Sequence, residues 1–422
     1  MSSTYLGSHQ AEAEAAAEIL RTTVAVRERA GQLLARARNG DSPWFVVDDG
    51  FLETTAKEVV DATRQRYPRL HVPLHSRWRH FEAGGVDRKG RLEALLADLP
   101  LPSRGHAMVD LTVVSVLLDA GAGPDWKYVE PATGQTFTRS EGLAVASFHA
   151  FVAGLFSSNK DRPLQVDAEG LRALPTDRLA EVLQVSESNP LVGLQDRAIL
   201  LRRLGEVMQE MPEVFGDEGR PGGLFDTVVT PFGHGVAQTA NVSAHEILSQ
   251  ILYSTSGIWP GGNAIGLVPL GDCWRHAAVR GEGLSDGWMP FHKLSQWMTY
   301  SLIEPFEWTG VSVDRLDTLT ALPEYRNGGL LIDSGLLRLR DEAAASQVWQ
   351  PGDEIIVEWR ALTVALMDEV AHAVRRQLNL SETQLPLGCV LEGGSWAAGR
   401  ELAQRHRAGL PPLNVVSDGT LF

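Results

Sequence analysis

The spacing of apolar residues along the 422-residue chain predicts mainly helices. Residues 11–38 carry apolar side chains near helical spacing in an Ala-, Glu-, Arg- and Leu-rich background, and Gly40 is placed to end a helix there. The stretch 109–123 is apolar throughout, and its length and terminal glycines favour a buried helix. A long core helix is expected over 354–378, where one stripe collects Trp359, Leu362, Leu366, Val370 and Val374.

Helix starts are indicated by a hydroxyl residue followed three positions later by Glu or Gln, the pattern of a capping box. It occurs at Thr55 with Glu58, at Ser243 with Glu246 and at Ser381 with Gln384. The segment PFHKLSQWMTYSLIEPF (290–306) predicts another helix, with His292 and Lys293 at its start. A cation at a helix N-terminus favours phosphate binding, although a solvated lysine is the simpler interpretation.

Strands are expected to be few. Residues 43–48 read as a short strand, and the segments DWKYVE and QTFTRS around 131–134 read as a hairpin. The pattern predicts a mainly α fold, a large helical body with a small β element in the N-terminal half. We expect an N-terminal region over 1–190 and a C-terminal region over 191–422, or one continuous domain.

Composition narrows the classes of function. Apolar runs are too short to cross a bilayer and the start is polar and acidic, so we expect a soluble cytoplasmic protein that binds no membrane. The two cysteines, Cys273 and Cys389, are too few for a disulfide framework. A net charge of -15 argues against nucleic-acid binding, while local arginines in 75–80 and 360–376 leave room for one small anionic ligand.

Several short motifs fail on their context. Residues 283–287 match a nucleophile elbow, but the flanking residues favour a loop. His245 and Glu246 lack the second histidine of a metalloprotease pair, which would fall at Ser249. Pro73 prevents a regular helix that would align the nearby histidines His71 and His75 as metal ligands. We expect no metal and no cofactor.

Five segments carry candidate chemistry, and each has a structural alternative. LPEYRNGGLLIDSG (322–335) sets Glu324, Tyr325 and Arg326 beside a Gly-Gly bend, or is a capped loop. The other four segments are His292-Lys293, Glu358-Trp359-Arg360, HSRWRHFEAGG (75–85) and LEGGSWAAGRELA (391–403). Their structural alternatives are, in the same order, a solvated lysine, a salt bridge, a structural network and close helix packing.

These segments resemble a known family. HSRWRHFEAGG, LPEYRNGGLLIDSG, EWRALTVALMDE, LPLGCVLEGGSWAAGRELA and the ending PPLNVVSDGTLF are closely similar to the uracil-catabolism proteins of fungi and bacteria, the Urc/Urg type. The likeness covers nearly the whole chain. It implies a role in degrading uracil by a route that passes through a ribonucleotide, with ribosylurea among its products.

A weaker resemblance concerns the chemistry. The order FHKLSQW, LPEYR and EWRALTVALMDE is similar to that in the queuosine-salvage N-glycosidases, helical hydrolases distantly similar to DNA glycosylases. This places Lys293, Glu324 and Arg360 at the corresponding positions. The chain departs from that pattern by having Glu324 in place of Asp and Gly-Gly in place of Pro-Gln after the triplet.

The two resemblances together imply hydrolysis of ribosylurea 5-phosphate to urea and ribose 5-phosphate. Glu324 is expected to face the ribose, where it would stabilise the positive charge that develops on the sugar or activate a water. A proton donor for urea is expected at Tyr325, His80 or His292. The substrate-binding set comprises Lys293, His292, Arg326, Glu358, Arg360, Arg77, Trp78, His80 and Trp126, with the cations on the phosphate and a tryptophan over the ureido group.

Two other classes of function fit the same sequence. One is an amidohydrolase or lyase acting on a ureido or ring-opened pyrimidine intermediate, which would ordinarily need a metal cluster or a reactive cysteine. The other is a non-catalytic partner of pathway enzymes, for which substitution of Glu324 or Lys293 leaves uracil utilisation intact.

Overall fold

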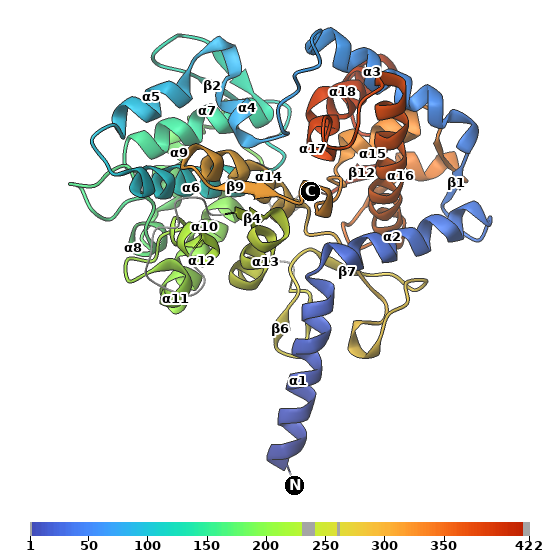
Figure 1. Ribbon diagram of the computed structural model, residues 1–422, viewed down its shortest axis with the longest axis horizontal. Coiled ribbons are helices and arrows are strands. Elements are labelled where there is room, and N and C mark those ends of the chain that lie inside the picture. Colours follow the sequence, from blue (N-terminus) through green and yellow to red (C-terminus); the bar gives the residue numbers. More distant parts are fainter. Residues whose placement is uncertain (1, 230–240, 260–261, 417–422) are drawn as a thin grey trace. The chain divides into compact units, whose positions relative to one another are not determined.

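A computed structural model describes residues 2–229, 241–259 and 262–416 of the chain (Figure 1). They form two compact units, each assembled from stretches that lie far apart in the sequence. Unit 1 comprises 1–75, 261–296 and 315–416, and unit 2 comprises 76–260 and 297–314, apart from the residues outside the description. Both units therefore draw on residues from each side of position 190. The last residues of the motif PPLNVVSDGTLF, 417–422, lie outside the described residues.

Unit 1 is built mainly from helices. They are α1 (Ser2–Leu20), α2 (Thr23–Arg38), α3 (Leu52–Arg66), the first turn of α14 (Lys293–Trp308), α15 (Tyr325–Asp333), α16 (Glu354–Leu378), α17 (Leu387–Val390) and α18 (Trp396–Arg407). Its strands pair two by two: β1 (Phe45–Val47) with β10 (Leu337–Leu339), β5 (Ala264–Ile265) with β6 (Val268–Pro269), β7 (Cys273–Arg275) with β8 (Trp288–Pro290), and β11 (Val348–Trp349) with β12 (Asn414–Val415).

Unit 2 holds the rest of α14 and ten further described helices. They are α4 (Arg77–Phe81), α5 (Arg88–Leu95), α6 (Leu101–Leu117), α7 (Arg139–Val152), α8 (Ala168–Arg172), α9 (Thr176–Val182), α10 (Leu194–Glu210), α11 (Pro212–Phe215), α12 (Gly223–Val229) and α13 (Ala244–Thr255). Its strands are β2 (Lys127–Val129) with β3 (Thr136–Thr138), and β4 (Asn241–Ser243) with β9 (Ser312–Asp314).

The mainly α class is confirmed, and every sheet among the described residues has two strands. The long helix over 354–378 is confirmed as α16, the apolar stretch falls largely in α6, and the hairpin is confirmed as β2–β3. Small sheets also occur in the C-terminal half, where no strand was predicted. The likeness to DNA glycosylases stays a prediction. Across the described residues, helices are too short or too polar to span a lipid bilayer.

Some helix boundaries differ from the predictions. The single helix expected over 11–38 is two helices, because Thr22 leaves helical geometry and its hydroxyl accepts the backbone N–H of Ala25. Thr55 does not begin a helix: α3 starts at Leu52, and the Thr55 hydroxyl donates to the Phe51 carbonyl. The capping box at Ser243 is confirmed.

The Ser381 pattern forms both of its hydrogen bonds, but in a turn that precedes α17. Gly328 and Gly329 form no bend, since both lie inside α15.

The framework of unit 1 is α16 packed against α2 and α3, and α15 packed against α18 (Figure 1). Glycines permit these close approaches. A Cβ on Gly399 of α18 would stand 2.2 Å from the Arg326 carbonyl oxygen, and one on Gly394 would stand 2.1 Å from the Val59 carbonyl oxygen. Close helix packing, one of the two interpretations of 391–403, is therefore present, and residues Leu391–Ser395 form a π-helical turn there.

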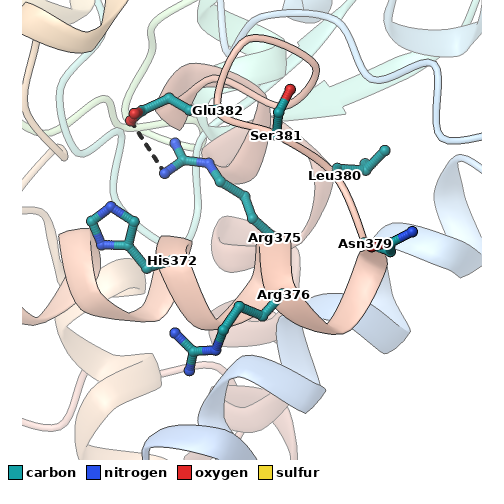
Figure 2. A pocket seen from close by; sticks show the side chains of 7 residues that line it. All are labelled: His372, Arg375, Arg376, Asn379, Leu380, Ser381 and Glu382. Carbon is teal, nitrogen blue, oxygen red and sulfur yellow. Dashed lines mark ion pairs between the residues drawn. The ribbon is translucent and has the colours of Figure 1, made fainter.

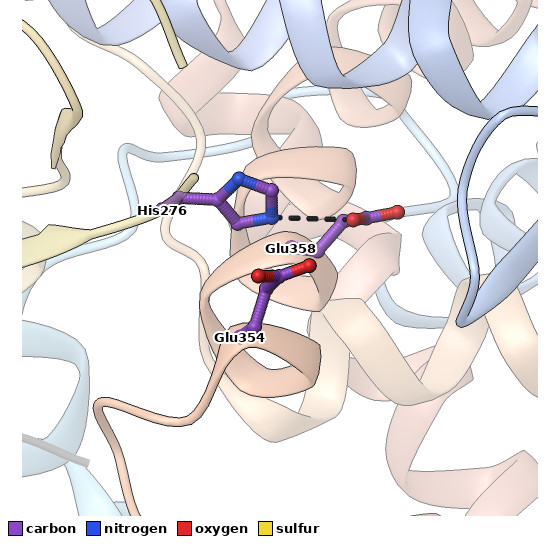
Figure 3. A group of neighbouring side chains, drawn as sticks. All are labelled: His276, Glu354 and Glu358. Carbon is purple, nitrogen blue, oxygen red and sulfur yellow. Dashed lines mark hydrogen bonds and ion pairs between the residues drawn. The ribbon is translucent and has the colours of Figure 1, made fainter. Parts of the chain in front are cut away.

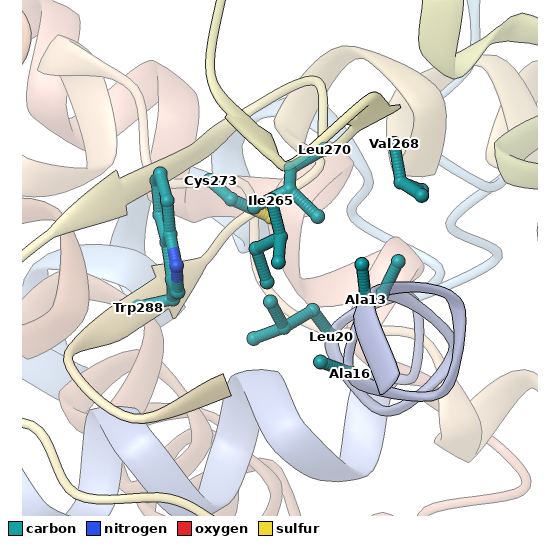
Figure 4. Packing of buried hydrophobic residues seen from close by; sticks show 9 residues of the cluster. Ala13, Ala16, Leu20, Ile265, Val268, Leu270, Cys273 and Trp288 are labelled. Carbon is teal, nitrogen blue, oxygen red and sulfur yellow. The ribbon is translucent and has the colours of Figure 1, made fainter. Parts of the chain in front are cut away.

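A second part of the unit 1 core joins α1 to the β5–β6 and β7–β8 hairpins (Figure 4). Ala13, Ala16 and Leu20 from α1 pack against apolar residues of the hairpins. The hairpin residues are Ile265, Val268, Leu270, Cys273 and Trp288. Burial of these side chains fixes the hairpin whose first strand, β7, follows directly after Asp272.

Candidate functional site

Three segments that the weaker resemblance aligns meet in unit 1. Arg360 of α16 donates from Nη1 and Nη2 to the Asp272 carboxylate at 2.8 and 2.7 Å, and its Nε lies 3.4 Å from the Pro323 carbonyl oxygen, next to Glu324. The backbone N–H of Lys293, at the start of α14, donates to the same carboxylate at 3.0 Å. Asp272 therefore connects the start of α14 to α16, and Arg360 connects α16 to the loop before α15.

Asp272 is a central residue that the sequence analysis missed. Burial alone would raise its pKa, but the charge and hydrogen bonds of Arg360, with the N–H of Lys293, outweigh burial and hold the pKa at about 2. Its carboxylate occupies the N-terminus of α14, where a phosphate was expected. The available signal was an acidic residue inside the apolar run Leu270-Gly-Asp-Cys-Trp, since a buried carboxylate needs partners.

Glu324 is the N-cap of α15. Its two carboxylate oxygens accept the backbone N–H groups of Arg326 and Asn327, both at 2.6 Å. The residue keeps some exposed surface, yet its carboxyl group lies deep enough for burial to raise its pKa, against the two N–H groups and the positive charge of Lys293. The structure thus places the Glu324 carboxylate within electrostatic reach of Lys293.

Exposure divides the predicted site residues of unit 1 into two groups. Three of them keep partly exposed side chains: Lys293, Glu324 and Tyr325. Four are buried: His292, Arg326, Glu358 and Arg360. Only the first group can meet a substrate in solution without a rearrangement of the chain.

The buried group has structural contacts. His292 Nε2 donates to the Leu20 carbonyl oxygen at 2.8 Å, and burial lowers the pKa of its imidazole. The Arg360 guanidinium lies over the Phe291 ring at 4.0 Å in addition to its bonds to Asp272. Arg326 Nη1 donates to the Gly409 carbonyl oxygen at 3.3 Å. These contacts orient the site and occupy groups that were expected to bind phosphate.

Glu358 makes the salt bridge that was one of its two interpretations. Its Oε2 lies 2.7 Å from Nη1 of Arg36 and 3.2 Å from Nε2 of His276. Neither Arg36 nor His276 was singled out from the sequence, because the partners come from segments more than 80 residues away.

The remaining predicted residues belong to unit 2. Arg77 is fully buried, with Nε donating to the Ser115 hydroxyl at 2.7 Å and Nη1 3.1 Å from the Asp119 carboxylate. His80 is partly exposed and lies 3.1 Å from Arg77 Nη1. HSRWRH therefore includes the structural network proposed as its alternative.

Trp78 and Trp126 are core residues of unit 2. Trp78 is 1% exposed and packs edge-on against Phe81 and Trp308, while Trp126 is 0% exposed and donates from Nε1 to the Leu183 carbonyl oxygen. Neither ring has a face open to a ligand, because both are enclosed by the core. Burial of Trp78 and Trp126 therefore disagrees with the prediction that one of these rings covers a ureido group.

A second buried carboxylate in unit 1, that of Glu392, joins the end of α3 to the π-helical turn. Glu392 accepts from Nη2 of Arg66 at 2.7 Å and from the Tyr67 hydroxyl at 3.0 Å, and its other oxygen lies 2.9 Å from Nδ1 of His75. Burial alone would raise the pKa of Glu392, but the bonds from His75 and Arg66 hold it at about 2. Every oxygen of this carboxylate is engaged, as expected of a structural group.

A surface depression of unit 1 lies apart from these residues. It lies at the end of α16, where Arg375 points toward Glu382 and Arg376 points away from it (Figure 2). Its arginines are already paired, Arg375 with Glu382 at 3.3 Å and Arg376 with Glu53 at 2.5 Å. A helix C-terminus also disfavours anions. None of the predicted site residues lines it.

Comparison with known proteins places the chain in a family. Residues 19–422 match the model described as a protein of unknown function, DUF1688. The chain is 39% identical to "Protein urg3" of Schizosaccharomyces pombe, with 94% of this chain and 96% of the relative covered. It is 38% identical to "Uracil catabolism protein 4" of Lachancea kluyveri, with 83% and 85% covered. The chain therefore belongs to the DUF1688 family, together with these Urc/Urg-type relatives.

Proposed function

We propose that this protein acts in uracil catabolism as an N-glycosidase that hydrolyses ribosylurea 5-phosphate to urea and ribose 5-phosphate. The pathway is supported by the relative named as a uracil catabolism protein. The observation that carries the reaction is the carboxylate of Glu324, a partly exposed residue, within electrostatic reach of Lys293. A carboxylate for the sugar and a cation for the phosphate are the two charges this substrate requires.

Glu324 acts at the ribose. Loss of a nitrogen leaving group builds positive charge on the sugar, which an adjacent carboxylate stabilises, and the same group can take a proton from the attacking water. The backbone N–H groups of Arg326 and Asn327 fix its orientation, so the carboxylate is preorganised. Its raised pKa suits a general base, because proton transfer is most effective when the pKa approaches the working pH.

Among the three expected proton donors, Tyr325 fits best. It is partly exposed and adjacent to Glu324, whereas the His292 Nε2–H already donates to the Leu20 carbonyl and His80 belongs to unit 2. Tyr325 protonates or hydrogen-bonds the departing urea nitrogen. Lys293 binds the phosphate, since Arg360 is held by Asp272 and Arg326 is buried.

One observation favours the non-catalytic alternative: both Glu324 oxygens cap α15, which is a sufficient structural reason for the residue. The test must therefore separate catalysis from capping. Purified full-length protein is incubated with ribosylurea 5-phosphate and released urea is measured, for the wild type and for Glu324→Gln. We expect the substitution to lower kcat by about 10²–10⁴-fold.

Ser243→Ala serves as the matched control, because it removes the capping box of α13 in unit 2 at a comparable cost of about 1 kcal/mol. It should keep wild-type turnover. Absence of urea release from the wild type above background, or equal turnover by folded Glu324→Gln, contradicts the proposal.

A further inference from the structure

His276, Glu354 and Glu358 form a group in unit 1 that no step of the proposed hydrolysis uses (Figure 3). Glu354 and Glu358 lie one turn apart on α16, so both carboxylates leave the same face of the helix. His276 follows directly after β7 and points its ring toward them (Figure 3). One ligand atom from each residue lies within 4.8 Å of the other two.

One carboxylate of this group carries an unsatisfied atom. Glu358 is 0% exposed, and its Oε2 is engaged by Arg36 and His276. Its Oε1 is buried without a hydrogen-bond partner among the described residues. A buried carboxylate oxygen without a partner is unfavourable, and a cation would satisfy it.

The net charge of the group also favours a bound cation. The two glutamates contribute two negative charges and Arg36 contributes one positive charge, which leaves the group net negative when His276 is neutral. Glu354 is partly exposed, with Oε1 3.4 Å from the indole nitrogen of Trp44, so an ion can enter from its side.

We infer that His276, Glu354 and Glu358 bind one divalent transition-metal ion. One nitrogen and two carboxylate ligands suit zinc or manganese better than calcium, which prefers six to eight oxygens. The ion takes Oε1 of Glu358 and leaves Oε2 to Arg36. Three protein ligands leave a coordination position for water, the pattern of an open site rather than a closed structural one.

Each ligand adjusts on binding. His276 Nε2 lies 3.2 Å from Glu358 Oε2 and not from Oε1, so the Glu358 carboxylate must turn to present Oε1. Glu354 must also rotate inward, because the ligand atoms of a tetrahedral ion are roughly 3.4 Å apart. His276 Nδ1 accepts the Ala278 N–H at 3.1 Å, which leaves the proton on Nε2. Ligation by Nε2 moves this proton to Nδ1 and gives up the Ala278 bond, which lowers the affinity.

The test uses full-length, tag-free protein stripped with a chelator. Zinc chloride and manganese chloride are titrated separately by calorimetry, and metal content after dialysis is measured by mass spectrometry. We expect about one equivalent per chain for the wild type and a metal-dependent rise in Tm. Glu354→Gln, at the partly exposed ligand, should weaken binding by at least about tenfold while leaving Tm in chelator unchanged.

Glu358→Gln should lose binding in the same way, and Glu342→Gln, at an exposed carboxylate outside the group, should bind like the wild type. Failure of the wild type to bind either ion saturably overturns the inference. Equal stoichiometry and affinity in Glu354→Gln also overturns it, because the ion would then be held elsewhere. The inference does not rest on the proposed hydrolysis, since binding and Tm are read without substrate.

Discussion

Buried charged residues of unit 1 form ion pairs with a defined hydrogen-bond geometry. Arg360 and Asp272 form a two-bond ion pair in which both residues are at most 3% exposed. A planar guanidinium is suited to this arrangement, and a lysine would supply only one direction of approach. Since Asp272 also receives the Lys293 N–H, the pair determines where the ammonium-bearing residue of the proposed site begins its helix.

Substitution of Asp272 by Asn should therefore cost stability. It leaves the buried Arg360 charge without its partner, for which the expected loss in free energy of unfolding is about 3–5 kcal/mol. Urea denaturation measures it. The double variant Asp272→Leu with Arg360→Met should lose less than the sum of its single variants, since neither charge is then stranded. Additive losses, or a loss below about 1 kcal/mol for Asp272→Asn, contradict the ion-pair argument.

The pH dependence of turnover should report on Glu324. Burial raises its pKa above the ordinary 4.5, and the proposed reaction needs the ionised carboxylate. Activity should thus fall as the pH drops through a value above 4.5, and it should be kept at higher pH. The measurement is kcat against pH with ribosylurea 5-phosphate. Glu324→Asp should retain part of the activity and shift the pH at which kcat falls on the acidic side. If that pH is the same in Glu324→Asp as in the wild type, the fall in kcat belongs to another group.

At the scale of elements, glycines decide how closely helices approach. The contact of α15 with α18 depends on Gly399, where an added Cβ would meet the Arg326 carbonyl oxygen. The same backbone carries the cap at Glu324, so packing of α18 and orientation of the proposed catalytic carboxylate are linked.

Gly399→Ala should accordingly destabilise the protein by about 1–3 kcal/mol, because backbone must shift to admit the methyl group. Gly31→Ala is the matched control: this glycine lies in α2, is exposed, and has no atom within 4 Å of an added Cβ. It should stabilise by about 0.5–1 kcal/mol through helix propensity. Urea denaturation of both variants checks the opposite signs, and equal effects would show that packing is not the cause.

The sequence predicted the positions of helices better than the contacts that their residues make. Periodicity located α16 over the same residues, 354–378, because a long apolar stripe is a local property. It placed one helix over 11–38 because the side-chain cap at Thr22 gives little signal in a helical background. Gly328 was assigned to a bend since glycine usually ends helices, whereas here it admits the Trp359 ring.

The candidate site was predicted in part for the same reason. Lys293, Glu324 and Arg360 lie in segments that were singled out by their residue chemistry and then aligned by a resemblance, and the structure connects these segments in unit 1. Asp272, His276 and Arg36 were missed, because their roles depend on partners 88, 82 and 322 residues away. Local sequence patterns carry no information on such separations.

At the scale of the whole molecule, protonation of Glu392 should account for part of the loss of stability in acid. Its pKa is about 2 in the folded protein against 4.5 ordinarily, so its contribution to stability is present above about pH 4.5 and is lost as pH falls towards 2. A shift of this size corresponds to about 3 kcal/mol. Free energies of unfolding measured by urea between about pH 6 and pH 3 should therefore fall in the wild type.

Glu392→Gln isolates this contribution from that of other carboxylates, because those are unchanged in the variant. We expect it to be less stable than the wild type at about pH 6, since Arg66 and His75 lose their charged partner, and to depend less steeply on pH below 4.5. Glu342→Gln, at an exposed carboxylate, should follow the wild-type curve. Parallel curves for Glu392→Gln and the wild type would mean that acid unfolds the chain through other groups, and that the junction of α3 with the π-helical turn does not set its acid stability.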